Sequence, residues 1–176
     1  MPTKPFFIRM EKKRKHLERS QDASRLLQNT SLFAAIGCVL LAAVSWYFLD
    51  VSQPLPFLLI ALALIFGLQI LLLQRFPEKP LPYLLINGLA YLVVFGISLY
   101  TGGVASPFIS VFALFILGGY LNKTSTGNIY LGAAVLFIGA LLVLSPSLEA
   151  FESTIPPGRE SLFSALVFLF FLVVLG

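Results

Sequence analysis

Charged residues are scarce in this chain. They make up 11% of its 176 residues, whereas hydrophobic residues make up 58% and the mean hydropathy is +0.92. Ordinary soluble domains carry about 25% charged residues. So little charge excludes a soluble globular enzyme, and so much apolar surface excludes a disordered chain. The composition predicts an integral membrane protein.

Residues that usually carry catalysis or bind metals are also nearly absent. The chain holds one histidine, His16, and one cysteine, Cys38, which excludes a disulfide framework, a zinc site and a Cys/His nucleophile. The glycine pairs Gly102-Gly103 and Gly118-Gly119 do not form a phosphate-binding motif. Charged residues in the middle of apolar runs, which ion-coupled transporters need, are also missing. We therefore expect no catalytic residue, no metal site and no cofactor site in this segment.

Long runs without charge make up most of the remaining sequence. Only Asp50 interrupts the run Leu26–Gln74, and three further runs follow it: Pro80–Asn122, Thr124–Leu148 and Ser161–Gly176. A helix of about 20 apolar residues crosses a bilayer. We predict an all-α, polytopic membrane protein with six transmembrane helices, at about Ser31–Leu49, Phe57–Gln74, Pro82–Tyr100, Phe108–Leu121, Ile129–Leu144 and Ser161–Gly176.

Positive charge is concentrated at the N-terminus. Eight of the twelve Lys and Arg residues precede residue 26, and residues 1–29 predict a basic cytoplasmic helix that runs into the first span. With the N-terminus inside, Arg75, Lys79 and Lys123 also lie inside, and only Arg159 lies outside. We therefore predict that both ends are cytoplasmic, in an inner (plasma) membrane. The basic helix then faces anionic lipid and not nucleic acid.

Two amide side chains lie within the predicted spans. Gln69 in the second span and Asn87 in the third are at similar distances from the predicted cytoplasmic surface. Their matched depth predicts a hydrogen bond between the two helices, worth about 1 kcal/mol. We interpret them as a structural polar pair rather than a ligand site.

A short segment rich in glycine joins the third and fourth predicted spans. Its two glycines allow a tight turn, its serine suits a helix N-cap and its proline suits the first helical turn. The free N–H groups of the following helix, the serine hydroxyl and the flanking aromatic rings fit a polar ring such as a quinone head group. The same features also fit an ordinary turn between helices. The candidate ligand-binding residues are Tyr100, Gly102, Gly103, Ser106, Pro107 and Phe108.

This turn resembles a motif of a known family. Its sequence Gly-Gly-Val-Ala-Ser-Pro-Phe is similar to the Gly-Gly-x-x-Asn-Pro-Phe heptapeptide of RegB/PrrB-type redox-sensing histidine kinases. In that family the motif lies between spans three and four of a six-span sensor domain and is linked to ubiquinone binding. The resemblance implies that residues 30–176 are such a sensor domain, with ubiquinone or menaquinone as ligand. Ser106 stands where the family has asparagine, so the side chain is shorter and lacks the amide.

The resemblance also implies partners that this segment does not contain. A sensor histidine kinase works as a homodimer and signals to a response regulator through a cytoplasmic domain that binds ATP. The last predicted span has only sixteen residues and no charged residue follows it, so we expect the chain to continue past Gly176. The Thr-Gly-Gly-x-x-Ser-Pro-Phe form of the motif, which begins at Thr101, is also similar to membrane sensor modules of other bacterial histidine kinases and of diguanylate cyclases. A further alternative is a small complete membrane protein, such as a transporter subunit or scaffold, that assembles through glycine faces such as that of Gly132 and Gly139.

Overall fold

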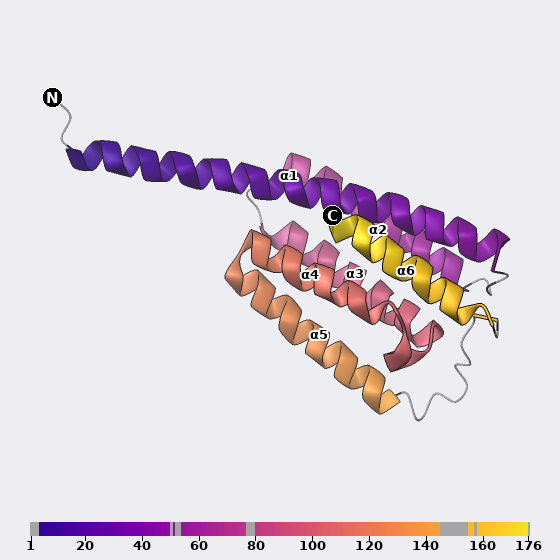
Figure 1. Cartoon of the computed structure of the whole chain (residues 1–176). Helices are drawn as coiled ribbons and strands as arrows, with labels where there is room; N and C mark the ends of the chain where they lie inside the picture. Colours follow the sequence, from indigo (N-terminus) through magenta and orange to yellow (C-terminus); the bar gives the residue numbers. More distant parts are fainter. Residues whose placement is uncertain are drawn as a thin grey trace.

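The structure is a computed structural model that describes residues 4–49, 51, 54–76, 80–144, 155–156 and 158–175. All regular structure in this part of the chain is helical, as predicted. The helices lie alongside one another, and the N-terminal half of the first projects beyond the others (Figure 1). In chain order the elements are α1 (Lys4–Tyr47), α2 (Pro54–Arg75), α3 (Pro80–Tyr100), the 3-10 helix η1 (Gly103–Ala105), α4 (Ile109–Asn122), α5 (Thr124–Leu144) and α6 (Glu160–Leu175).

The basic N-terminal segment and the first predicted span form one helix. α1 has 44 residues and continues through position 30 without a break, because no proline or glycine lies between Pro5 and Gly37. At 1.5 Å per residue its length is about 66 Å, roughly twice the thickness of a hydrocarbon core. The boundary predicted at residue 30 is therefore a change of composition and not a break in the backbone.

Three helical stretches are long and apolar enough to cross a membrane: Arg25–Tyr47, Pro54–Arg75 and Thr124–Leu144. They correspond to the first, second and fifth predicted spans and support a membrane protein. The other three predicted spans correspond to shorter apolar stretches, Leu84–Tyr100, Ile109–Tyr120 and Glu160–Val174. The 14 residues of α4 rise only about 21 Å, less than the thickness of a hydrocarbon core. Within the described residues, length and composition thus support three of the six predicted spans as membrane-crossing helices and do not support all six.

Close helix contacts are made where glycine replaces a side chain. α1 packs along α2, α4 packs along α5, and α6 lies against α1 and α4 (Figure 1). A methyl group at Gly37 of α1 would overlap the Phe170 ring of α6, and one at Gly127 of α5 would overlap a tyrosine ring of α4. Gly132 and Gly139 face open space instead. A side chain at either position would therefore meet no other part of the described chain within 4 Å.

An aromatic cluster joins α3, α4 and α5. The Tyr91 ring is its centre, with its centroid 5.1 Å from that of Phe112, 4.7 Å from that of Phe115 and 6.0 Å from that of Phe137. The Tyr91 hydroxyl donates a 3.0 Å hydrogen bond to the carbonyl oxygen of Tyr130 in α5. These contacts connect α3 to both α4 and α5.

Candidate functional site

The turn between α3 and α4 depends on its two glycines. Gly102 has φ of 108° and Gly103 has φ of 60°, values in the left-handed region that side chains disfavour. The chain then forms the single 3-10 turn η1 before Ser106, and the regular helix α4 begins at Ile109. The predicted tight turn is therefore present, with Ser106 three residues before the first residue of α4.

Three polar groups of the turn form a hydrogen-bonded relay. The Phe108 N–H donates to the Ser106 Oγ at 3.2 Å, and the Ser106 and Thr101 hydroxyls lie 2.6 Å apart. The Thr101 hydroxyl donates its proton to the Ile97 carbonyl oxygen at 2.8 Å. Since each hydroxyl has one proton, the Ser106 hydroxyl must donate to Thr101. Both side chains are buried, so every step of the relay is shielded from solvent.

The polar groups that we expected to face a ligand are thus used within the turn. The Ser106 hydroxyl both donates and accepts a hydrogen bond, and Pro107 has no N–H. The next N–H groups donate to backbone carbonyls, from Ile109 to Ser106, from Ser110 to Pro107 and from Val111 to Phe108. Of the other candidate residues, Tyr100, Gly102, Gly103 and Pro107 are partly buried. Hydrogen bonds within the turn therefore fix its backbone at the start of α4.

Phe108 turns away from the surface and connects the turn to α6. Its side chain is fully buried, and its ring centroid lies 6.0 Å from that of Phe163. It also lines a cavity of about 50 Å³ together with Phe170, which lies seven residues, or about two helical turns, beyond Phe163 in α6. The turn therefore contacts α6 through an apolar ring rather than through a hydrogen bond, although Phe108 and Phe163 are 55 residues apart in the chain.

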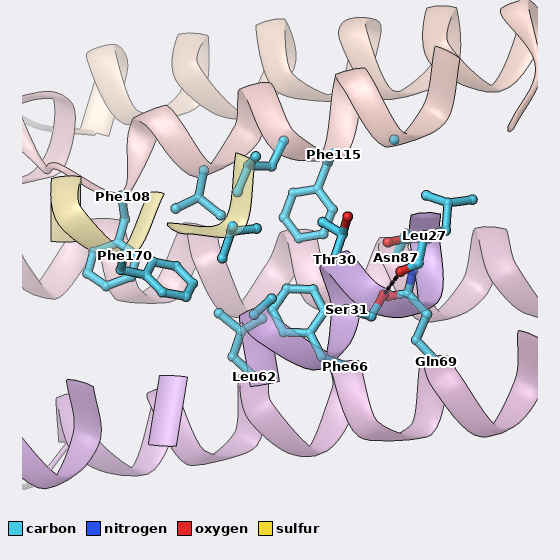
Figure 2. A pocket seen from close by; sticks show the side chains of 15 residues that line it. Leu27, Thr30, Ser31, Leu62, Phe66, Gln69, Asn87, Phe108, Phe115 and Phe170 are labelled. Atoms are coloured by element: carbon cyan, nitrogen blue, oxygen red, sulfur yellow. Dashed lines mark hydrogen bonds between the residues drawn. The ribbon is translucent and has the colours of Figure 1, made fainter. Parts of the chain in front are cut away.

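The cavity has an aromatic end and a polar end (Figure 2). Phe108 and Phe170 lie at one end, and Ser31, Gln69 and Asn87 lie at the other (Figure 2). Between them lie the rings of Phe66 and Phe115, stacked with centroids 6.1 Å apart. The complete wall comprises Leu27, Thr30, Ser31, Ala34, Leu62, Phe66, Gln69, Asn87, Phe108, Val111, Leu114, Phe115, Gly118, Phe170 and Val174.

The two predicted amides lie on the wall of this one cavity. Gln69 is 4% exposed and Asn87 is 2% exposed, so both side chains are buried between helices. The Gln69 Oε1 has no hydrogen-bond partner among the described residues. The predicted bond between the two helices is therefore not made through this oxygen, which is left facing the polar end of the cavity.

Sequence reasoning did not identify Thr101, Ser31 and Phe170 as part of the site. Thr101 and Ser31 each donate to the carbonyl oxygen four residues earlier, a local bond that Ser and Thr commonly make in helices and that signals no ligand. Phe170 is one of many apolar residues in α6, and its meeting with Phe108 depends on helix packing. Among the described residues, no group of three His, Cys, Asp or Glu side chains is placed to bind a metal ion.

No family model, curated protein or solved structure matches this chain. The resemblance to redox-sensing kinases consequently remains that of the seven residues in the α3–α4 turn. Any function assigned to the chain must be supported by the geometry of that turn and of the cavity beneath it.

The relay predicts a specific cost for Ser106→Ala. This change leaves the Phe108 N–H without its acceptor and removes the donor to Thr101, in a buried place where water does not replace them. We expect the free energy of unfolding to fall by about 1–3 kcal/mol, measured by chemical denaturation in micelles. Ser125→Ala, at an exposed position in the first turn of α5, is the matched control and should change it by less than about 0.5 kcal/mol. Equal effects of the two changes would contradict the relay.

Proposed function

We propose that this chain is the membrane-embedded sensor module of a bacterial two-component histidine kinase. The observation that carries the proposal is the buried contact between Phe108 of the α3–α4 turn and Phe163 of α6. A change at the turn then alters the packing of the helix that leads out of the module. The resemblance of the turn to the kinase heptapeptide supports the same function.

In the proposed arrangement, the chain crosses a bacterial inner membrane six times, and both of its ends lie on the cytoplasmic side. The basic N-terminal half of α1, Arg75 and Lys123 are then inside, where positive charge is favoured. Trp46 and Tyr47, at the other end of α1, are 47% and 80% exposed, as expected for aromatic residues at a membrane interface. α3 has 21 residues, as many as α5, and the two shorter helices α4 and α6 cross as parts of the bundle, with local thinning of the bilayer.

The proposed signal passes from the turn to α6 and from α6 to α1. α6 touches α1 where Phe170 meets Gly37, and at its start Arg159 donates a 3.0 Å hydrogen bond to the Phe48 carbonyl oxygen. A ligand shifts such a bundle only if it binds one packing better than another. Following the resemblance, we propose ubiquinone or menaquinone as that ligand, with a homodimer and a response regulator as partners. The Ser106–Thr101 hydrogen bond limits how the quinone binds. The serine hydroxyl has one proton, so it donates to a quinone carbonyl only if its bond to Thr101 is broken.

Cysteine labelling in cells tests the six-span arrangement. In a Cys38→Ala background, Val104→Cys in the α3–α4 turn should react with a membrane-impermeant maleimide in intact spheroplasts. Ser125→Cys, next to Lys123, should react only after the membrane is permeabilised. If only the three long helices crossed the membrane, the turn would stay on the cytoplasmic side and Val104→Cys would be protected. That result would contradict six spans.

Distances between α1 and α6 test the sensor function. Spin labels at Leu40→Cys in α1 and Leu169→Cys in α6 occupy exposed positions, again with Cys38→Ala. In proteoliposomes we expect the distance between labels, measured by pulsed electron paramagnetic resonance, to differ by about 1–2 Å between oxidised and reduced ubiquinone. Phe108→Ala should abolish the difference, and Phe33→Ala, an exposed ring on α1, should preserve it. Identical distances in the two redox states would overturn the proposal.

A further inference from the structure

Three side-chain oxygens on the cavity wall, those of Thr30, Ser31 and Gln69, are each able to accept a further hydrogen bond. The Ser31 hydroxyl donates its only proton to the Leu27 carbonyl oxygen at 2.8 Å, and the Thr30 hydroxyl donates to the Leu26 carbonyl oxygen at 2.8 Å. Each Oγ atom therefore retains only its lone pairs. The Gln69 Oε1 beside them is buried and has no partner among the described residues. An unpartnered buried acceptor is costly, so this end of the cavity favours a molecule that supplies a donor.

The remaining wall restricts what such a molecule can be. No lining residue is charged, which disfavours carboxylates, phosphates and ammonium groups because their charge would be buried without a partner. Most of the wall is aliphatic or aromatic. A volume of about 50 Å³ exceeds the roughly 10–15 Å³ that one water requires, and a buried water needs two to four polar partners. An apolar body therefore fits the aromatic end better than water does.

The cavity wall is least buried between α1 and α4. Thr30 of α1 and Leu114 and Gly118 of α4 line it and are only partly buried, so the cavity reaches the surface between these two helices. At Gly118 no side chain covers the opening. A molecule too long for the cavity is thus able to place its head inside and leave its chain in lipid.

We propose that this cavity binds the head of a neutral amphiphile that carries a hydroxyl group, an alcohol on an apolar chain. The hydroxyl donates a hydrogen bond to the Gln69 Oε1, its first carbons lie against Phe66 and Phe115, and the chain leaves between α1 and α4. The hydroxyl-binding end of this site, at Gln69, lies at the opposite end of the cavity from Phe108 of the α3–α4 turn (Figure 2). Its occupation does not depend on the sensor function, because binding is measured without any signalling output.

Photolabelling with a diazirine analogue of 1-octanol tests the site directly. The purified chain in micelles is irradiated, the labelled residues are identified by mass spectrometry, and unlabelled competitors are added. We expect labels on α1 and α4 residues of the cavity wall. We expect 1-octanol to compete about five- to tenfold better than octyl methyl ether, which has the same shape but no O–H donor. Equal competition by the two compounds would overturn the proposal, because it indicates non-specific partitioning.

Two variants separate binding from folding. Gln69→Leu removes the acceptor, and the variant should remain folded because the Oε1 that is lost has no partner among the described residues. Labelling should fall about five- to tenfold. Gly118→Leu should block the opening and reduce labelling similarly. Gly132→Leu on α5, where an added Cβ meets nothing within 4 Å, is its matched control and should leave labelling unchanged. Circular dichroism verifies that each variant is helical, and undiminished labelling of folded Gln69→Leu would contradict the assigned head-group position.

Discussion

A bilayer supplies no hydrogen-bond partners, and this constraint determines where polar groups lie in the chain. Backbone groups are satisfied within helices, and hydroxyls of Thr30, Ser31 and Thr101 donate to carbonyls four residues earlier. Where the backbone must leave the helix between α3 and α4, the Ser106–Thr101 relay and the 3-10 turn take up the N–H groups that would otherwise be exposed. Among the described residues, the buried side-chain oxygens of Ser45, Gln69 and Ser98 depart from this pattern, and of these three only the Gln69 Oε1 belongs to a residue that lines the cavity.

The polar relay and the aromatic contacts act together at Phe108. The relay holds the backbone of the turn in one geometry, and this geometry directs the Phe108 ring inward to Phe163 and towards the cavity. α6 in turn meets α1 at Gly37, where the absence of a side chain allows the Phe170 ring to approach. The turn, the cavity and the two helices α1 and α6 are therefore joined by apolar packing, which is sensitive to small changes in helix position.

Much of the fold followed from composition, because long uncharged runs in a chain with 11% charged residues have few alternatives to membrane helices. The sequence predicted that Gln69 and Asn87 lie at a similar distance from the cytoplasmic surface, and the structure places both on the wall of one cavity. Which apolar residues face inward was not predictable, since these helices are apolar on all sides and lack the periodicity that marks a buried face. The Phe108–Phe163 contact joins residues 55 positions apart, and no local pattern indicates it. The turn was located correctly from its glycines and proline, but the use of its polar groups depended on the hydroxyl of Thr101, which was not among the candidate ligand-binding residues.

The central claim is that the turn and α6 are energetically coupled through Phe108 and Phe163. A double-mutant cycle with Phe108→Leu and Phe163→Leu, using the free energy of unfolding in bicelles, measures this coupling without any ligand or output. We predict an interaction energy of about 0.5–1.5 kcal/mol, the range for buried aromatic pairs. Additive effects of the two substitutions, within about 0.3 kcal/mol, would show that the rings do not interact and would contradict the link between the turn and α6.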